Sequence, residues 1–280
     1  MPKVIGLAKT LGVKGMKGFH ESLYQCSHEL FGLSRDEFAE KWRPKLDEET
    51  GTLRGYMQPT AEALFEQWKT CRDPNWLYSH PEYKWDSIGC STFQSCVTTA
   101  SGIGLLRKHG YPSPKKIFDW GAGPGFSSLM LAKNFPDSEV HFNECNADLI
   151  AVFEWFKASS GLTNLKVVSK PEGEYDVIQA YEISEHFSSS TKGVGDPIGP
   201  QDAVLQYVTK PDAYFLHSSC WSVENRYFTL GHFLHSEIDG VIHPNTRVGK
   251  FFRAAMGLRG WEILGAGWNS RPHLYCKRVH

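Results

Sequence analysis

A glycine turn placed directly after an apolar strand constrains the fold of this chain more than any other feature. The strand ends in Asp119, and glycines follow at positions 121, 123 and 125. A helical stretch, Ser127 to Asn134, comes next. Glycine is needed in such a turn where φ is positive or where the backbone approaches a ligand too closely for a side chain. The strand, turn and helix together predict a loop that wraps around a small ligand.

The spacing of these glycines separates classes of cofactor. The dinucleotide fingerprint G-x-G-x-x-G would require glycine at position 126, which is Phe126 here. The phosphate-loop pattern G-x-x-x-x-G-K-S/T is absent from this run. The observed G-x-G-x-G after Asp119 resembles motif I of the class I S-adenosylmethionine-dependent methyltransferases. The alternative is a glycine turn that only joins a strand to a helix.

The segments that follow have the order expected of that family. Glu144 ends the next strand, 25 positions after Asp119, where an acid can accept hydrogen bonds from a ribose diol. Strands alternating with helices predict a doubly wound α/β sheet. Further strands are expected at 165–169, 175–180 and 213–219, with a final antiparallel pair at 262–264 and 273–276. The resemblance implies a seven-stranded, mostly parallel Rossmann-like methyltransferase fold, and helical patterns in the residues before it predict an N-terminal helical extension.

The chain of 280 residues is expected to divide into two parts. Residues 1–111 are interpreted as a helical extension or cap, and residues 112–280 as the methyltransferase core, with insertions at 188–212 and 220–250. Within the extension, helices are expected at 20–31, 34–46, 60–71 and 91–108, and an ordered loop at 73–90. The aromatic residues of that loop either line a substrate pocket or hold the extension to the core.

The resemblance assigns S-adenosylmethionine as the cofactor. The turn backbone would lie under its methionine and ribose, Asp119 would orient the turn and reach the amino-acid group, and Glu144 would take the ribose hydroxyls. The expected cofactor-binding residues are Asp119, Gly121, Ala122, Gly123, Gly125, Glu144 and Glu182. Methyl transfer mainly needs alignment and desolvation, and a base is needed only for a protonated nucleophile. The sequence assigns no catalytic residue.

A second pattern, Glu-x-x-Glu-His, follows the fourth core strand. Glu182, Glu185 and His186 offer two carboxylates and an imidazole, a plausible set of ligands for Mg²⁺ or Mn²⁺. Two subfamilies of the family that this chain resembles bind a divalent ion with this pattern, and His232 or His235 would complete the shell. In the alternative, Glu182 orders the cofactor loop and His186 caps the following turn without a metal.

We therefore expect methyl transfer to an oxygen or nitrogen atom of a small-molecule acceptor. Two alternatives stay open: a nucleic-acid methyltransferase, and a non-catalytic protein that retains the fold. The net charge of −1 predicts no general attraction to nucleic acid, although residues 241–280 carry seven basic residues and one acid. The motifs D/N-P-P-Y/F and Pro-Cys of DNA-modifying methyltransferases are absent.

The compartment is predicted from cysteine usage and hydropathy. Seven cysteines without a C-x-x-C pair suit a reducing environment, and no apolar run reaches about 18 residues. These features predict a cytoplasmic protein with no membrane partner.

Overall fold

The computed structural model describes residues 15–46, 53–57, 64, 67, 76, 79–90, 95–109, 113–181, 183, 205–207, 210–218, 256–265 and 273–277. The chain forms two compact units. The first unit comprises Met1–Ala100, Ala122–Pro136 and Glu144–Leu165, and the second comprises Ser101–Gly121, Asp137–Asn143 and Lys166–His280. The chain passes from the second unit to the first within the glycine turn.

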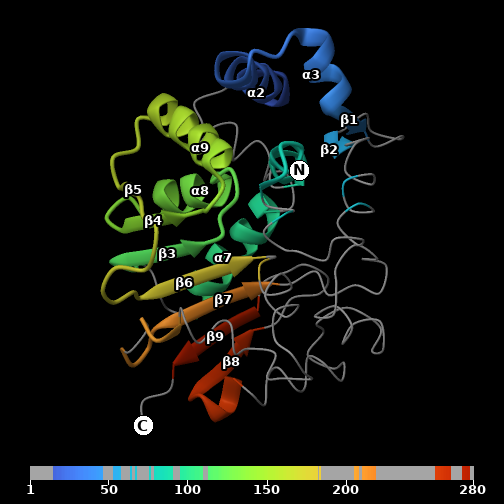
Figure 1. Cartoon of the computed structure of the whole chain (residues 1–280). Helices are drawn as coiled ribbons and strands as arrows, with labels where there is room; N and C mark the ends of the chain where they lie inside the picture. Colours follow the sequence, from blue (N-terminus) through green and yellow to red (C-terminus); the bar gives the residue numbers. More distant parts are fainter. Residues whose placement is uncertain are drawn as a thin grey trace. The chain divides into compact units, whose positions relative to one another are not determined.

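A single sheet contains seven strands in the order β5-β4-β3-β6-β7-β9-β8 (Figure 1). Its strands are β3 (Lys116–Trp120), β4 (Glu139–Asn143), β5 (Leu165–Val167), β6 (Val177–Tyr181), β7 (Tyr214–Ser218), β8 (Trp261–Gly265) and β9 (His273–Lys277). The first five strands in this order are parallel, and β9 runs antiparallel to both β7 and β8. The predicted α/β architecture with a parallel sheet is confirmed.

The sequence of the central strands explains their position. All five residues of β6 are buried, and so are the three inner residues of β3. Near-continuous apolar runs of this kind are typical of parallel strands that are covered on both faces. Phe118, Ile178 and Phe215 from β3, β6 and β7 pack in one buried cluster with Tyr175 and Trp261.

Helices connect the parallel strands because a parallel pair needs a crossover. Helix α8 (Phe126–Asn134) joins β3 to β4, and α9 (Ala147–Ser160) joins β4 to β5. Asn146 is the N-cap of α9, and its side chain accepts hydrogen bonds from the backbone N–H groups of Asp148 and Leu149. Helix α7 (Cys96–Lys108) precedes β3.

The N-terminal segment contributes helices α2 (Gly15–Phe31), α3 (Arg35–Lys41) and α6 (Tyr83–Cys90) and the antiparallel pair β1 (Arg43–Leu46) and β2 (Leu53–Met57) (Figure 1). Within the first unit, the rings of Phe19, Phe126 and Phe156 bring α2, α8 and α9 together. Their centroids lie 5.1 to 6.3 Å apart. Aromatic contacts of this geometry add to the stabilisation from burial.

Two expectations for the N-terminal segment were wrong. The helix expected at 34–46 ends at Lys41, and residues 43–46 form strand β1 instead. Pro44 explains the early end, because proline lacks a backbone N–H and disfavours helical geometry in the residue before it. The loop expected at 73–90 contains helix α6 in its last part.

Several expectations lie outside the described residues. These include most of the helix at 60–71, the whole insertion at 220–250 and most of that at 188–212. The division of the chain at residue 111 and the cap role of the extension stay predictions. Among the helices the structure describes, none is long and apolar enough to cross a membrane.

Candidate active site

Three glycines after β3 adopt the backbone conformation expected of them. The φ angles are +60° at Gly121, +57° at Gly123 and +77° at Gly125. A residue with a Cβ is disfavoured in this left-handed region. At Gly121 an added Cβ would lie 2.1 Å from Ile183 Cδ1, so the turn also leaves no room for a side chain there. The expectation of positive φ angles in this turn is confirmed.

Asp119 is held at the carboxyl end of β3 by a neighbouring strand. Its side chain is 2% exposed, and Gln179 Nε2 donates a hydrogen bond to Asp119 Oδ1 at 2.9 Å. The two residues are paired in the register of β3 and β6. A buried carboxylate needs such donors because desolvation otherwise makes its charged form unfavourable. Sequence reasoning missed Gln179, although a polar residue inside the strand V-I-Q-A-Y was the available signal.

Tyr181 ends β6 two residues after Gln179 and is also buried. Within the part of the chain that the structure describes, its hydroxyl and Gln179 Oε1 have no hydrogen-bond partner. Burial raises the pKa of the Tyr181 phenol well above its usual value, and the nearby charge of Asp119 raises it further. The phenol is therefore neutral and offers an O–H group at the carboxyl edge of the sheet.

Glu144 accepts three hydrogen bonds from backbone N–H groups in the first unit. Gly123 N donates to Glu144 Oε2 at 3.0 Å, while Cys145 N and Asn146 N donate to Oε1 at 2.7 and 3.0 Å. The Cys145 side chain adds a further hydrogen bond to the same carboxylate. These donors fix the direction of both oxygens of Glu144. The structure thus brings together Gly123 and Glu144, two residues that the sequence assigned to the same cofactor.

Comparisons with known proteins bear on the fold. No family model matches the sequence, and no curated protein matches it. A solved structure of an O-methyltransferase family protein from Burkholderia thailandensis is similar with a TM-score of 0.55 at 12% identity, covering 97% of this chain and 86% of that one. The chain has the class I methyltransferase fold.

Two further solved structures are similar at lower TM-scores. A putative O-methyltransferase from Klebsiella pneumoniae has a TM-score of 0.45 at 13% identity, covering 80% of this chain and 91% of that one. Magnesium protoporphyrin IX methyltransferase from Synechocystis has a TM-score of 0.47 at 14% identity, covering 78% of this chain and 96% of that one.

The expected metal ligands cannot be placed in this methyltransferase fold. Glu182, Glu185, His186, His232 and His235 all lie outside the described residues. Among the residues that are described, no group of three or more His, Cys, Asp or Glu side chains could hold a metal ion. The metal site therefore stays a prediction.

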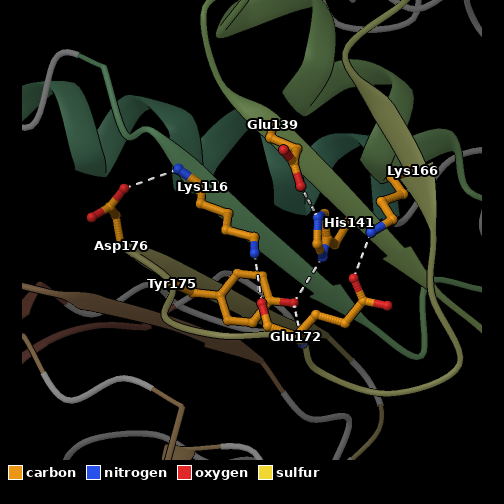
Figure 2. Close-up of polar contacts among 7 residues, drawn as sticks. All are labelled: Lys116, Glu139, His141, Lys166, Glu172, Tyr175 and Asp176. Carbon is orange, nitrogen blue, oxygen red and sulfur yellow. Dashed lines mark hydrogen bonds and ion pairs between the residues drawn. The ribbon is translucent and has the colours of Figure 1, made fainter.

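A second polar cluster lies at the amino ends of the strands of the methyltransferase-fold sheet (Figure 2). Its buried members are His141, Tyr175 and Asp176, and His141 lies between Tyr175 and Glu139. His141 Nδ1 is 2.8 Å from Tyr175 Oη, and His141 Nε2 contacts the Glu139 carboxylate. Glu172 N donates to Tyr175 Oη at 2.8 Å.

These contacts specify one proton arrangement. The Glu139 carboxylate can only accept, so His141 Nε2 carries the proton and donates it. Nδ1 is then the acceptor for the Tyr175 hydroxyl. A second proton on His141 would face that hydroxyl and leave the Tyr175 O–H without its acceptor. The geometry therefore favours a neutral imidazole.

We predict that His141 makes the protein less stable at acidic pH. Burial lowers the pKa of His141 below 6.5, and the positive charges of Lys116 and Lys166 lower it further. The hydrogen bond to Glu139 raises this pKa but does not outweigh the effect of burial. Since the unfolded chain binds the proton more readily, the contribution of His141 to stability is complete above pH 6.5. It is lost as the pH falls from there through the folded-state pKa.

Denaturant unfolding of the wild type and His141→Phe between pH 7.5 and 5 tests this prediction. Other histidines titrate in both proteins, so the difference between the two curves isolates His141. We expect the variant to be less stable at pH 7.5, because it loses two hydrogen bonds, and to lose less stability on acidification. Curves of stability against pH that run parallel for the two proteins would contradict the prediction.

The Glu139 carboxylate titrates below the pH range of this experiment, because the hydrogen bond from His141 lowers its pKa below 4.5.

Proposed function

We propose that this protein transfers the methyl group of S-adenosylmethionine to an oxygen or nitrogen atom of a small-molecule acceptor. The observation that carries the proposal is the hydrogen bond from Gly123 N to Glu144 Oε2. It ties a turn of three left-handed glycines to an acid whose carboxylate is oriented by backbone donors. A turn with glycine at alternate positions beside an oriented carboxylate fits a ligand that carries a ribose diol.

The expected cofactor residues that the structure describes, which exclude Glu182, have distinct roles in this proposal. The backbone of Gly121, Ala122, Gly123 and Gly125 would line the methionine and ribose portion, and Glu144 would accept from a ribose hydroxyl. Asp119, oriented by Gln179, would face the amino-acid group. When bound, the sulfonium supplies an activated methyl group whose transfer releases a neutral thioether. The protein then has to align the acceptor and exclude water.

The finer parts of the proposal concern the acceptor side. The N-terminal helices and the insertions at 188–212 and 220–250 would cap the site, since loops after the carboxyl ends of the strands lie over the ligand crevice in such sheets. If Glu182, Glu185 and His186 bind Mg²⁺ or Mn²⁺ with His232 or His235, the ion would lower the pKa of an acceptor hydroxyl. That arrangement would favour an oxygen acceptor.

Glu144→Ala tests the proposal by calorimetric titration with S-adenosylhomocysteine. We expect micromolar binding by the wild type and a loss of about 1–3 kcal/mol in the variant, because a hydroxyl of the ligand and Gly123 N lose their acceptor. Glu154→Ala is the matched control, since Glu154 lies on the exposed face of α9 and pairs only with Lys157 among the contacts described. No binding by the wild type would overturn the proposed function.

A further inference from the structure

A lysine of helix α6 is held by one carboxylate and two aromatic rings. Lys84 Nζ lies 2.6 Å from Asp148 Oδ2, 4.5 Å from the centroid of the Phe31 ring and 4.9 Å from that of the Trp85 ring. The Lys84 side chain is only 15% exposed. An ammonium group that is largely removed from water gains more from ring faces and from an ion pair than an exposed one does. The position of this side chain is therefore well defined.

The partner of Lys84 lies in the first turn of helix α9. Asp148 N donates to Asn146 Oδ1 at 3.0 Å, so the residue that pairs with Lys84 also completes the N-terminal cap of α9. Asn146 N in turn donates to Glu144 Oε1 at 3.0 Å. Glu144 Oε2 accepts from Gly123 N. All of these residues belong to the first unit.

These contacts form an unbroken path from α6 to the glycine turn. We propose that Lys84 is a positioning residue for the cofactor site, acting on Glu144 through Asp148 and the Asn146 cap. Lys84 fixes the first turn of α9, and this turn fixes the backbone N–H groups that orient the Glu144 carboxylate. The inference rests on the proposed function, because it assigns to the N-terminal segment a role in the binding of the same cofactor.

A purely structural role is the competing explanation for Lys84. The same contacts tie α6 to α9, and a variant that lost them would be less stable even if the cofactor site were untouched. The two roles differ in one respect: positioning acts through Glu144, so it disappears when the Glu144 carboxylate is absent. A double-mutant cycle measures this dependence directly.

The experiment measures the affinity for S-adenosylhomocysteine of the wild type, Lys84→Met, Glu144→Ala and the double variant. Methionine keeps the length and the apolar stem of the side chain but removes the charge. We expect Lys84→Met to weaken binding about three- to tenfold when Glu144 is present. In the Glu144→Ala background the same change should have less than about a twofold effect.

Two further variants complete the design. Lys84→Arg should restore most of the affinity, because a guanidinium can pair with Asp148 and stack on the same rings. Lys41→Met is the matched control: Lys41 forms an ion pair of 2.5 Å with Glu82 and lies 5.9 Å from the Trp85 ring, but it has no described contact with α9. It should leave the affinity unchanged.

The possible outcomes separate the inference from the proposed function. An equal loss in both Glu144 backgrounds, or no loss in Lys84→Met, would overturn the positioning role while the proposed function stands. If Lys84→Met does not fold, Asp148→Asn removes the same ion pair and has to show the same dependence on Glu144. A wild-type protein that binds neither S-adenosylmethionine nor S-adenosylhomocysteine would overturn the proposed function and this inference with it.

Discussion

Replacement of Gly123 with valine is expected to abolish binding of S-adenosylmethionine and S-adenosylhomocysteine. Gly123 has a φ of +57°. An L-amino acid in this left-handed conformation is destabilised by about 1–2 kcal/mol, and β-branched residues such as valine are rarely found in it. Gly123 is also buried, and its N–H donates to Glu144 Oε2 at 3.0 Å. Relief of the backbone strain would turn this N–H away from Glu144. The isopropyl group would occupy space that the turn otherwise leaves to a ligand.

Gly161→Val is the matched control for this variant. Gly161 ends helix α9 at a φ of +67°, and an added Cβ would meet nothing within 4 Å. The control therefore carries similar backbone strain without a role at the cofactor site. We expect both variants to lower the melting temperature and only Gly123→Val to lose detectable binding in calorimetry. Unchanged affinity in folded Gly123→Val would remove the main argument for a cofactor site in this turn.

Replacement of Gly102 with alanine is expected to destabilise the second unit by about 1–3 kcal/mol, the usual range for overpacking a core. Gly102 lies in α7, and an added Cβ would be 2.3 Å from Tyr181 Oη and 3.2 Å from Leu216 Cδ1. Neither neighbour can move away easily, because Tyr181 and Leu216 are both buried in the sheet. The gain of alanine over glycine in helix propensity, about 1 kcal/mol, is too small to offset this overlap.

Gly104→Ala provides the control on the same helix. Its added Cβ would meet nothing within 4 Å, so the variant should be more stable than the wild type by about 0.4–1 kcal/mol. Tyr181→Phe removes the hydroxyl that Gly102→Ala would strike, and the combination should recover most of the lost stability. Denaturant unfolding of the wild type, the three single variants and the combination measures these differences. Destabilisation of similar size in Gly102→Ala and Gly104→Ala would contradict the assignment of the effect to Tyr181.

Local chemistry allowed much of the fold to be predicted from the sequence. The run from Lys116 to Gly125 indicates a strand and a glycine turn, because both depend on residues adjacent in the chain. Alternation of apolar strands with helices indicates a parallel sheet, since parallel neighbours need crossovers. The helix expected at 34–46 begins as its capping signal at Ser34 and Glu37 indicates, but it ends at Lys41 because Pro44 cannot continue it.

The site residues that belong to a sequence motif could be predicted. The site residues that are placed only by tertiary contacts could not. Asp119, the glycines and Glu144 were found because their spacing belongs to a known pattern. Gln179 lies 60 positions from Asp119, and Lys84 lies 64 positions from Asp148. Neither pairing produces a periodic pattern in the sequence. The first depends on the register of β3 and β6, and the second on the packing of α6 against α9.

The sequence by itself determined the order of strands and helices in the core, the glycine turn and the acid that follows it, since these arise from local backbone preference and hydrophobic periodicity. Only the tertiary structure decided that Glu144 reaches back to Gly123, that Tyr181 occupies the space left by Gly102, and that Lys84 pairs with Asp148. The physical reason is that such contacts depend on the packing of whole elements. Packing brings together residues that no interval along the chain connects.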